Sequence, residues 1–177
     1  MSATKMMRKQ LGQSLVEVLI ALVVVTILSS ALIVAIITGL KNSQFAQKQT
    51  QATKYAQDAM DRIRTIRDRD GNVTFKGTTA TFSALWNMNM SYPTNCNGPC
   101  YFKLVDTGGE ISLTDSGVSS SYWESLGESL SRQIIFEDIS TGTPPLYQSE
   151  KDLTVRVKWT DTSGDHESYL QTTLTKY

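Results

Sequence analysis

The sequence is poor in the residues that most often carry out chemistry. Among its 177 residues are one histidine, His166, and two cysteines, Cys96 and Cys100. It has no glycine-rich phosphate loop, no zinc motif and no recognisable pair of catalytic carboxylates. An enzymatic function therefore has no specific residue to support it. We expect no catalytic residue, no cofactor and no metal.

Positive charge is scarce after the N-terminus. Residues 1–12 carry Lys5, Arg8 and Lys9 and no acid, whereas the rest of the chain has 14 basic and 17 acidic residues, a balance of −3. Proteins that bind nucleic acid gather lysine and arginine on one face or stripe. Because this sequence has no such cluster, we predict no direct nucleic-acid ligand.

Proline and charge are both missing from a long N-terminal stretch. No proline occurs between residues 15 and 92, and residues 18–40 are uncharged and apolar on all sides. As a helix, these 23 positions would span roughly 34 Å, enough to cross a hydrocarbon core of about 30 Å. The basic residues before this stretch predict a cytoplasmic N-terminus and an exported remainder. The apolar region of an ordinary secretory signal peptide is shorter than this stretch, so that interpretation of the N-terminus is disfavoured.

One carboxylate, Glu17, interrupts the start of the apolar stretch. An ionisable group near the end of a membrane helix is costly and usually has a partner, which makes Glu17 a candidate functional residue. Alternatively, Glu17 reaches back to the lipid headgroups or favours the positive end of the helix dipole. The spacing alone does not decide between these two interpretations.

Residues 12–17, GQSLVE, resemble the class III signal of type IV prepilins and type II secretion pseudopilins. That signal is a glycine, a variable residue, Ser or Thr, Leu, an aliphatic residue and Glu, between a basic leader and an apolar helix. Gln13 departs from the commoner Phe or Met at the variable position. The resemblance implies that a prepilin peptidase cleaves after Gly12 and that Gln13 becomes an N-methylated N-terminus. It also implies that Glu17 pairs with the N-terminal amine of a neighbouring subunit.

The resemblance implies a structural subunit of a type IV pilus or of a type II secretion-like filament. Its partners would be other pilin subunits, the peptidase and an inner-membrane assembly platform. The chain would cross the inner membrane once and then enter an extracellular or periplasmic filament. The alternative is a single-pass anchored sensor or adhesin domain that never leaves the membrane, and an anchored enzyme is a third class. Many pilins carry a proline in the apolar helix, and this chain does not.

The helix is expected to continue beyond the apolar stretch. Residues 41–70 lack proline and glycine and are rich in helix formers, so one helix from about residue 13 to 68 would be roughly 84 Å long. Glycine at position 71, able to adopt the left-handed conformation, is predicted to end it. Two exposed ion pairs are predicted, Asp58–Arg62 and Asp61–Arg64. One apolar stripe is formed by Ala52, Tyr55, Ala56, Ala59, Met60, Ile63 and Ile66.

After the helix, the hydrophobic pattern becomes that of strands. Residues 151–160 alternate, with 153, 155, 157 and 159 apolar, and residues 166–175 are expected to pair with them. Residues 101–105 and 110–114 flank a hairpin turn, and residues 132–139 form another strand. Segments 115–131 and 141–145 are predicted to be surface loops. The predicted fold is α+β, with a leader (1–12), an apolar helix (13–40), an amphipathic continuation (41–70) and an antiparallel head (71–177) that loosely resembles minor-pilin heads.

The remaining polar candidates lie in the predicted head. Cys96 and Cys100 flank two turn formers, which favours a small disulfide-closed loop over half of a metal site or two free thiols. His166 has no neighbouring nucleophile and is predicted to be a solvated turn residue. Calcium binding between Asp161 and Asp165 is a weaker alternative, because their spacing matches no calcium loop. The three tryptophans, Trp86, Trp123 and Trp159, are interpreted as packing residues rather than a sugar site.

Overall fold

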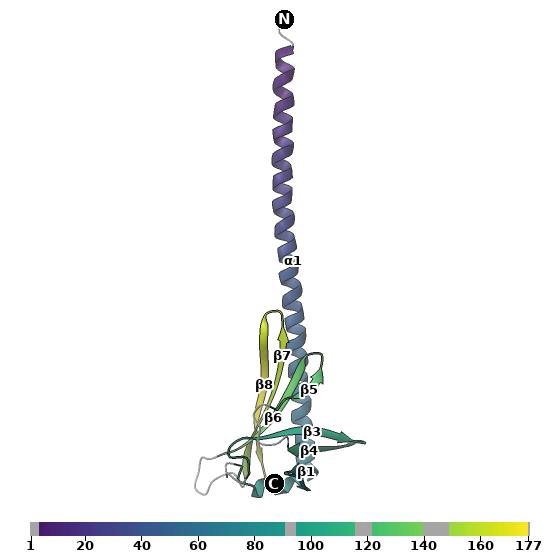
Figure 1. The fold of residues 1–177 in the computed structure, drawn as a ribbon, viewed down its shortest axis with the longest axis vertical. Coiled ribbons are helices and arrows are strands. Elements are labelled where there is room, and N and C mark those ends of the chain that lie inside the picture. The colour runs from purple at the N-terminus through teal and green to yellow at the C-terminus, as the bar shows by residue number, and fades with distance from the viewer. Residues whose placement is uncertain (1–3, 91–94, 116–121, 140–148, 177) are drawn as a thin grey trace. The chain divides into compact units, whose positions relative to one another are not determined.

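The computed structural model of the chain describes residues 4–90, 95–115, 122–139 and 149–176. The chain divides into two compact units, Met1–Ala46 and Gln47–Tyr177, the second of which we call the head unit. Helix α1, Thr4–Asp68, forms the first unit and its C-terminal part belongs to the head unit (Figure 1). The helix begins before residue 13 because the leader contains good helix formers and no proline.

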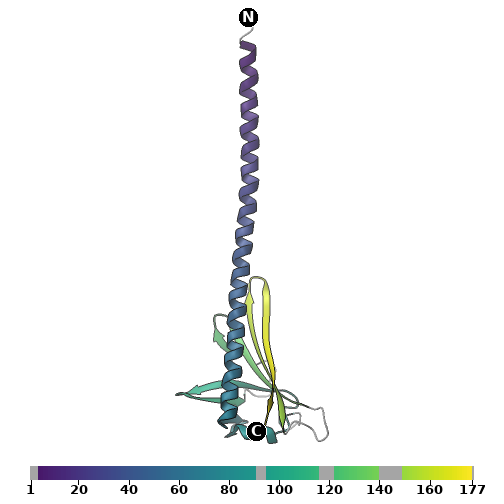
Figure 2. The same cartoon turned by 180° about the vertical axis from the view of Figure 1, so that it is seen from behind.

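The head unit is built on one sheet of eight strands, in the order β2-β1-β4-β3-β6-β7-β8, with β5 also paired to β6. The predicted α+β fold with a long N-terminal helix is confirmed. The sheet is antiparallel except where β1 runs parallel to β4. Strands β3 and β4 cross the direction of β7 and β8 (Figures 1 and 2). The strands are β1 Asn72–Phe75, β2 Thr78–Thr81, β3 Cys100–Thr107, β4 Glu110–Asp115, β5 Glu124–Gly127, β6 Leu130–Asp138, β7 Glu150–Asp161 and β8 Gly164–Thr175.

The core of the head unit lies between α1 and one face of the sheet, which we call the inner face. Alanines on the helix stripe lack bulk and allow a close approach to the large side chains of the inner face. Tyr55, predicted on this stripe, is instead 37% exposed, because it lies at the border of the contact rather than at its centre. The buried residues of α1 are Ala52, Ala56, Ala59, Met60, Ile63 and Ile66, and they face Phe102, Leu113, Ile134, Phe136, Leu153, Val155, Val157 and Trp159.

Two hairpins follow the predicted pattern. Strands β7 and β8 pair over their whole length, and the alternation of β7 buries its four apolar side chains while Arg156 and Lys158 are exposed. Strands β3 and β4 are joined by Gly108 and Gly109, both with positive φ (68° and 96°). A two-residue turn with both φ positive matches the twist of an antiparallel pair and favours glycine. Local sequence is therefore sufficient to define both hairpins.

Other elements of the head were not predicted. Strands β1 and β2 form a hairpin around Lys76 and Gly77, both with positive φ, and a 3-10 helix, η1 (Phe82–Asn87), follows them. The prediction of a loop over 115–131 is wrong in part, because β5 lies in it and pairs with β6. The predicted loop at 141–145 lies outside the described residues. Glycine at position 77 was a usable turn signal, but the four-residue strands beside it are too short to show a period.

The end of α1 differs from the prediction in one residue. Asp70, not Gly71, adopts the left-handed conformation, with φ of 49°. The Gly71 N–H donates to the Ile66 carbonyl (2.7 Å) and the Asp70 N–H to the Arg67 carbonyl (3.1 Å), which is the Schellman pattern. A Cβ on residue 71 would lie 3.2 Å from Ile66 Cγ2. Glycine is thus favoured there by close packing rather than by its φ angle.

The side chain of Asp70 ties the helix end to η1. Its Oδ1 accepts hydrogen bonds from the Ser83 N–H (2.7 Å) and the Ser83 hydroxyl (2.8 Å). These bonds, the side-chain one first, lower the pKa of Asp70 below its usual 3.8. Because the folded pKa is lowered, the carboxylate stabilises the fold above pH 3.8, and this stabilisation is lost as the pH falls through the folded value.

We therefore expect Asp70→Asn to flatten part of the acid dependence of stability. An asparagine keeps the acceptor and tolerates the left-handed conformation, but it does not titrate. The measurement is the urea midpoint of the full chain in detergent at pH 7 and pH 3, followed by tryptophan fluorescence. The fall in the urea midpoint from pH 7 to pH 3 should be smaller in the variant than in the wild type. Equal losses in the two proteins would show that Asp70 does not contribute.

Candidate functional site

The first unit presents its apolar side chains to the surroundings. From residue 15 to residue 46 every α1 residue is exposed, and its large aliphatic side chains are between 45% and 67% exposed up to Leu40. In the described part of the chain, one candidate membrane span is found, and it lies within α1 at Leu15–Asp68, which is long and apolar enough to cross a membrane. A fully apolar, exposed helix is stable only in lipid or within a bundle of other helices.

Polar side chains within this helix are satisfied by the helix itself. Hydroxyls of Thr26, Ser29, Ser30 and Thr38 donate to backbone carbonyls three or four residues earlier, at 2.8–2.9 Å. In a hydrocarbon environment an unsatisfied hydroxyl would be costly. These internal bonds make the apolar stretch compatible with lipid despite its four hydroxyls.

Glu17 is the exception among these residues. It is exposed and flanked by exposed aliphatic side chains such as Val16 and Val18. Within the described residues, no hydrogen bond or ion pair of its carboxylate is present in the single chain. Gly12 and Gln13 lie earlier in the same helix. A carboxylate in this setting requires a partner from outside the chain or an aqueous boundary.

Comparison with known proteins matches this segment alone. Residues 7–33 match the model of the prokaryotic N-terminal methylation motif. The match confirms the resemblance of the N-terminal region to the class III signal of type IV pilins, and the long apolar helix follows it directly. No curated protein and no solved structure matches the chain. The motif supports a prepilin-like precursor, and the resemblance of the head to minor pilins stays a prediction.

The two cysteines are joined in the head unit. Cys96 and Cys100 form a disulfide bond with Cα atoms 5.4 Å apart, at the entry to β3. Asn97 and Gly98 between them have positive φ (56° and 138°), which closes the short loop. Both cysteines are buried. The geometry accounts for both thiols without a metal.

A buried ion pair lies close to this loop. Lys151 Nζ is 2.5 Å from Asp138 Oδ1, and the two side chains are only 1% and 4% exposed. Lys151 also donates to the Met88 carbonyl (2.9 Å), and Asp138 Oδ2 accepts from the Met90 N–H (2.6 Å). Burial lowers the pKa of Lys151, and Asp138 opposes that effect. Sequence analysis missed this pair, because an acid at one strand end and a lysine at the next strand start look like surface charges.

The β7–β8 turn also differs from expectation. His166 was predicted to be solvated, but its side chain is only 24% exposed. Its ring stacks on Trp159 with the ring centroids 5.4 Å apart, and its Nε2 lies 3.0 Å from Asp161 Oδ1. The Ser163 N–H is the main cause of a lowered pKa at Asp161. Asp165 accepts a bond from the Thr160 hydroxyl. These bonds give both carboxylates protein partners, and the described residues contain no group of three or more potential metal ligands.

The tryptophans fall into two groups. Trp86 and Trp159 are 3% and 2% exposed and belong to the core. Trp123 is half-buried, and the Lys158 ammonium lies 4.2 Å from the centre of one of its rings. A cation over an aromatic face is a stabilising surface contact. The packing interpretation therefore fits all three residues.

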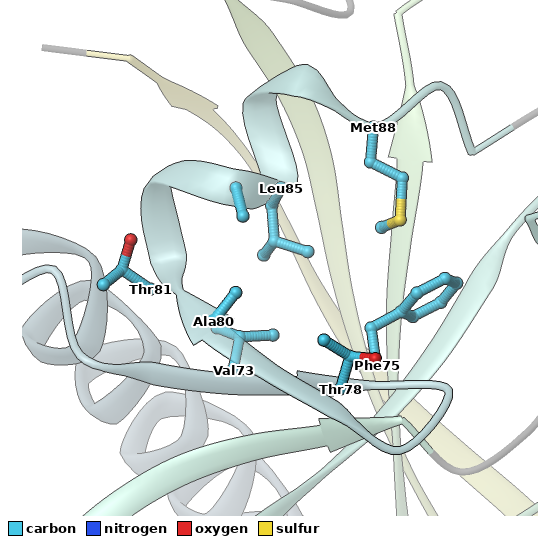
Figure 3. A pocket seen from close by; sticks show the side chains of 8 residues that line it. Val73, Phe75, Thr78, Ala80, Thr81, Leu85 and Met88 are labelled. Atoms are coloured by element: carbon cyan, nitrogen blue, oxygen red, sulfur yellow. The ribbon is translucent and has the colours of Figure 1, made fainter.

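A small apolar pocket lies between the β1–β2 hairpin and η1 (Figure 3). Its volume is about 180 Å³, and it opens to the surface where Thr78 and Ala84 of its lining are exposed. Small side chains at Ala80 and Ala84 leave this space between Phe75 and Leu85. The β1–β2 hairpin and η1 thus leave an apolar groove at this end of the sheet.

We expect Ala80→Val to raise the free energy of unfolding by about 0.5–1 kcal/mol. The added methyl groups would occupy part of the pocket, and valine favours a strand. Ala80→Thr is the matched control, because threonine has the shape and strand preference of valine but would set a hydroxyl against the apolar lining of the pocket. Urea titrations of the three full chains check this expectation. A gain of equal size in the control would assign the effect to strand propensity alone.

Proposed function

We propose that the chain is a precursor of a type IV pilin or type II secretion pseudopilin that is assembled into a filament through its N-terminal helix. The observation that carries the proposal is the methylation motif at residues 7–33, which runs into an exposed and uncharged apolar helix. The leader residues are basic, so the precursor would sit in the inner membrane with its N-terminus in the cytoplasm. The head unit would then be periplasmic or extracellular.

Processing is the first step of this proposal. A prepilin peptidase would cleave between Gly12 and Gln13, and the new amine of Gln13 would be methylated. The apolar helix would hold the mature chain in the membrane until the assembly platform incorporates it beside other pilin subunits. The absence of proline from the apolar stretch leaves Gly39 as the weakest helix former within it.

Glu17 has the assembly role in this proposal. The N-terminal ammonium of Gln13 and the carboxylate of Glu17 would both lie in an apolar bundle of helices. An unpaired charge is severely unfavourable there, whereas a close ion pair is tolerable. Pairing the amine of one subunit with Glu17 of its neighbour would therefore define the axial register between subunits.

Mass spectrometry of the N-terminal peptide tests the proposal. The peptide would be isolated from membranes and from material sheared off the cell surface. We expect a peptide that begins at Gln13, carries a methyl group and is present in the sheared fraction. A chain that retains residues 1–12 and stays wholly in the membrane would contradict the proposal. That result would favour an anchored sensor or adhesin domain instead.

A further inference from the structure

One buried residue, Met90, connects the disulfide loop to the buried ion pair. Its side chain is fully buried (0% exposed). Its carbonyl accepts hydrogen bonds from the N–H groups of Cys96 (3.2 Å) and Gly98 (3.3 Å). Its own N–H donates to Asp138 Oδ2 (2.6 Å). The backbone of a single residue is thus bonded to both features.

The ion pair depends on this backbone for two of its hydrogen bonds. Lys151 donates to the Met88 carbonyl, and Asp138 accepts from the Met90 N–H. Two buried charges are tolerated only when their remaining donors and acceptors are also satisfied. Moving Met88 and Met90 away would leave the pair with fewer partners at a site where both side chains are almost fully buried.

The disulfide holds Met90 through the carbonyl group of that residue. Cys100 is fixed in β3 by its pairing with Phe136 of β6, and the bond to Cys96 keeps Cys96 and Gly98 beside the Met90 carbonyl. Asn97 and Gly98, both with positive φ, form the turn between the two cysteines. Without the sulfur–sulfur bond, the hydrogen bonds seen among the described residues of this loop would be the two to the Met90 carbonyl and one from the Asn95 amide to the Asn89 carbonyl (2.6 Å).

We infer that the Cys96–Cys100 disulfide is a redox switch on the buried Lys151–Asp138 pair. Oxidation removes two protons and two electrons from the thiols and transfers them to a disulfide oxidant, which leaves as two thiols. In the oxidised head unit the pair keeps its bonds to the Met88 carbonyl and the Met90 N–H. In the reduced head unit Met88 and Met90 move away from the pair and solvent reaches Lys151, while the sheet stays folded. The head unit therefore gains its full stability only in an oxidising environment.

Chemical labelling of Lys151 tests this inference on the full chain in detergent. The chain is oxidised with glutathione disulfide or reduced with dithiothreitol, exposed to N-hydroxysuccinimidyl acetate, and analysed by peptide mass spectrometry. We expect reduction to raise the labelling rate of Lys151 by about tenfold or more, because labelling requires local opening. Lys54, exposed on α1, should label at the same rate in both states. The Cys96→Ser/Cys100→Ser chain should behave like the reduced protein.

A second comparison separates this coupling from an ordinary loss of a crosslink. The urea midpoint is measured with and without reductant for the wild type and for Asp138→Leu/Lys151→Met, in which an apolar pair replaces the ions. The inference predicts that reduction lowers the urea midpoint more in the wild type than in the double variant. Equal shifts in both chains, with Lys151 labelling unchanged, would overturn it. Complete loss of the folded tryptophan emission on reduction would also overturn it, because the inference requires a local opening.

Discussion

The Asp138→Leu chain should lose about 3–5 kcal/mol of its unfolding free energy, because the substitution leaves Lys151 buried without its counter-ion. Lys151 is 1% exposed and lies directly opposite Asp138 in the β6–β7 register, so in the folded head unit it stays out of water. The same substitution removes the acceptor of the Met90 N–H. All three tryptophans belong to the head unit, so their fluorescence reports its unfolding while the apolar helix stays in detergent.

Asp138→Leu/Lys151→Met should be more stable than Asp138→Leu alone. Replacing both ions removes the unpaired charge, although the Met88 carbonyl and the Met90 N–H still lose their partners. Arg156→Met is the matched control. Its ion pair with Glu167 is about half exposed on both sides, so its loss should change stability by less than about 1 kcal/mol. A double variant no better than Asp138→Leu would show that the charge itself is not the cause.

Glu17→Ala subunits should be almost excluded from filaments that also contain wild-type subunits. If the N-terminal amine of a neighbour is left buried without its carboxylate, the cost is about 3–5 kcal/mol, roughly a hundred- to several thousandfold in equilibrium occupancy. Both forms would be expressed at equal levels in one strain. The ratio of the two N-terminal peptides in sheared material, relative to membranes, measures incorporation.

Thr26→Ala is a suitable control for this experiment. Thr26 lies in the same apolar stretch, but its hydroxyl bonds to the Val23 carbonyl of its own helix at 2.8 Å. We therefore expect it to enter filaments at the wild-type level. Normal incorporation of Glu17→Ala would contradict the role of Glu17 in subunit register. Equal exclusion of both variants would instead indicate a general sensitivity of the apolar helix.

The N-terminal part of this protein could be predicted almost completely from sequence. Its features are local: a six-residue motif, a charge-free stretch longer than a bilayer core and a run without helix breakers. A membrane-type helix satisfies its backbone internally, and Thr26, Ser29, Ser30 and Thr38 satisfy their hydroxyls in the same way. Such a helix needs no information from the rest of the chain to form.

The head could be predicted only where local pattern is strong. Residues 153–159 of β7 alternate between apolar and polar without a break, and two adjacent glycines make the β3–β4 turn. Strands β1, β2 and β5 have four residues each, too few for a period to be visible. Their positions depend on partners, including the parallel pairing of β1 with β4. Pairing between strands distant in sequence is a tertiary property and leaves little trace in a short segment.

By itself, the sequence determined the long helix, the motif that begins it, the strongest hairpins and the proximity of Cys96 and Cys100. Only the tertiary structure decided that Asp138 and Lys151 meet in the interior and that Met90 joins them to the disulfide loop. The physical reason is that periodicity and turn chemistry act between neighbours in the chain. The burial of a charge, in contrast, depends on every element packed around it. Those elements come from distant parts of the chain, so the local sequence does not reveal them.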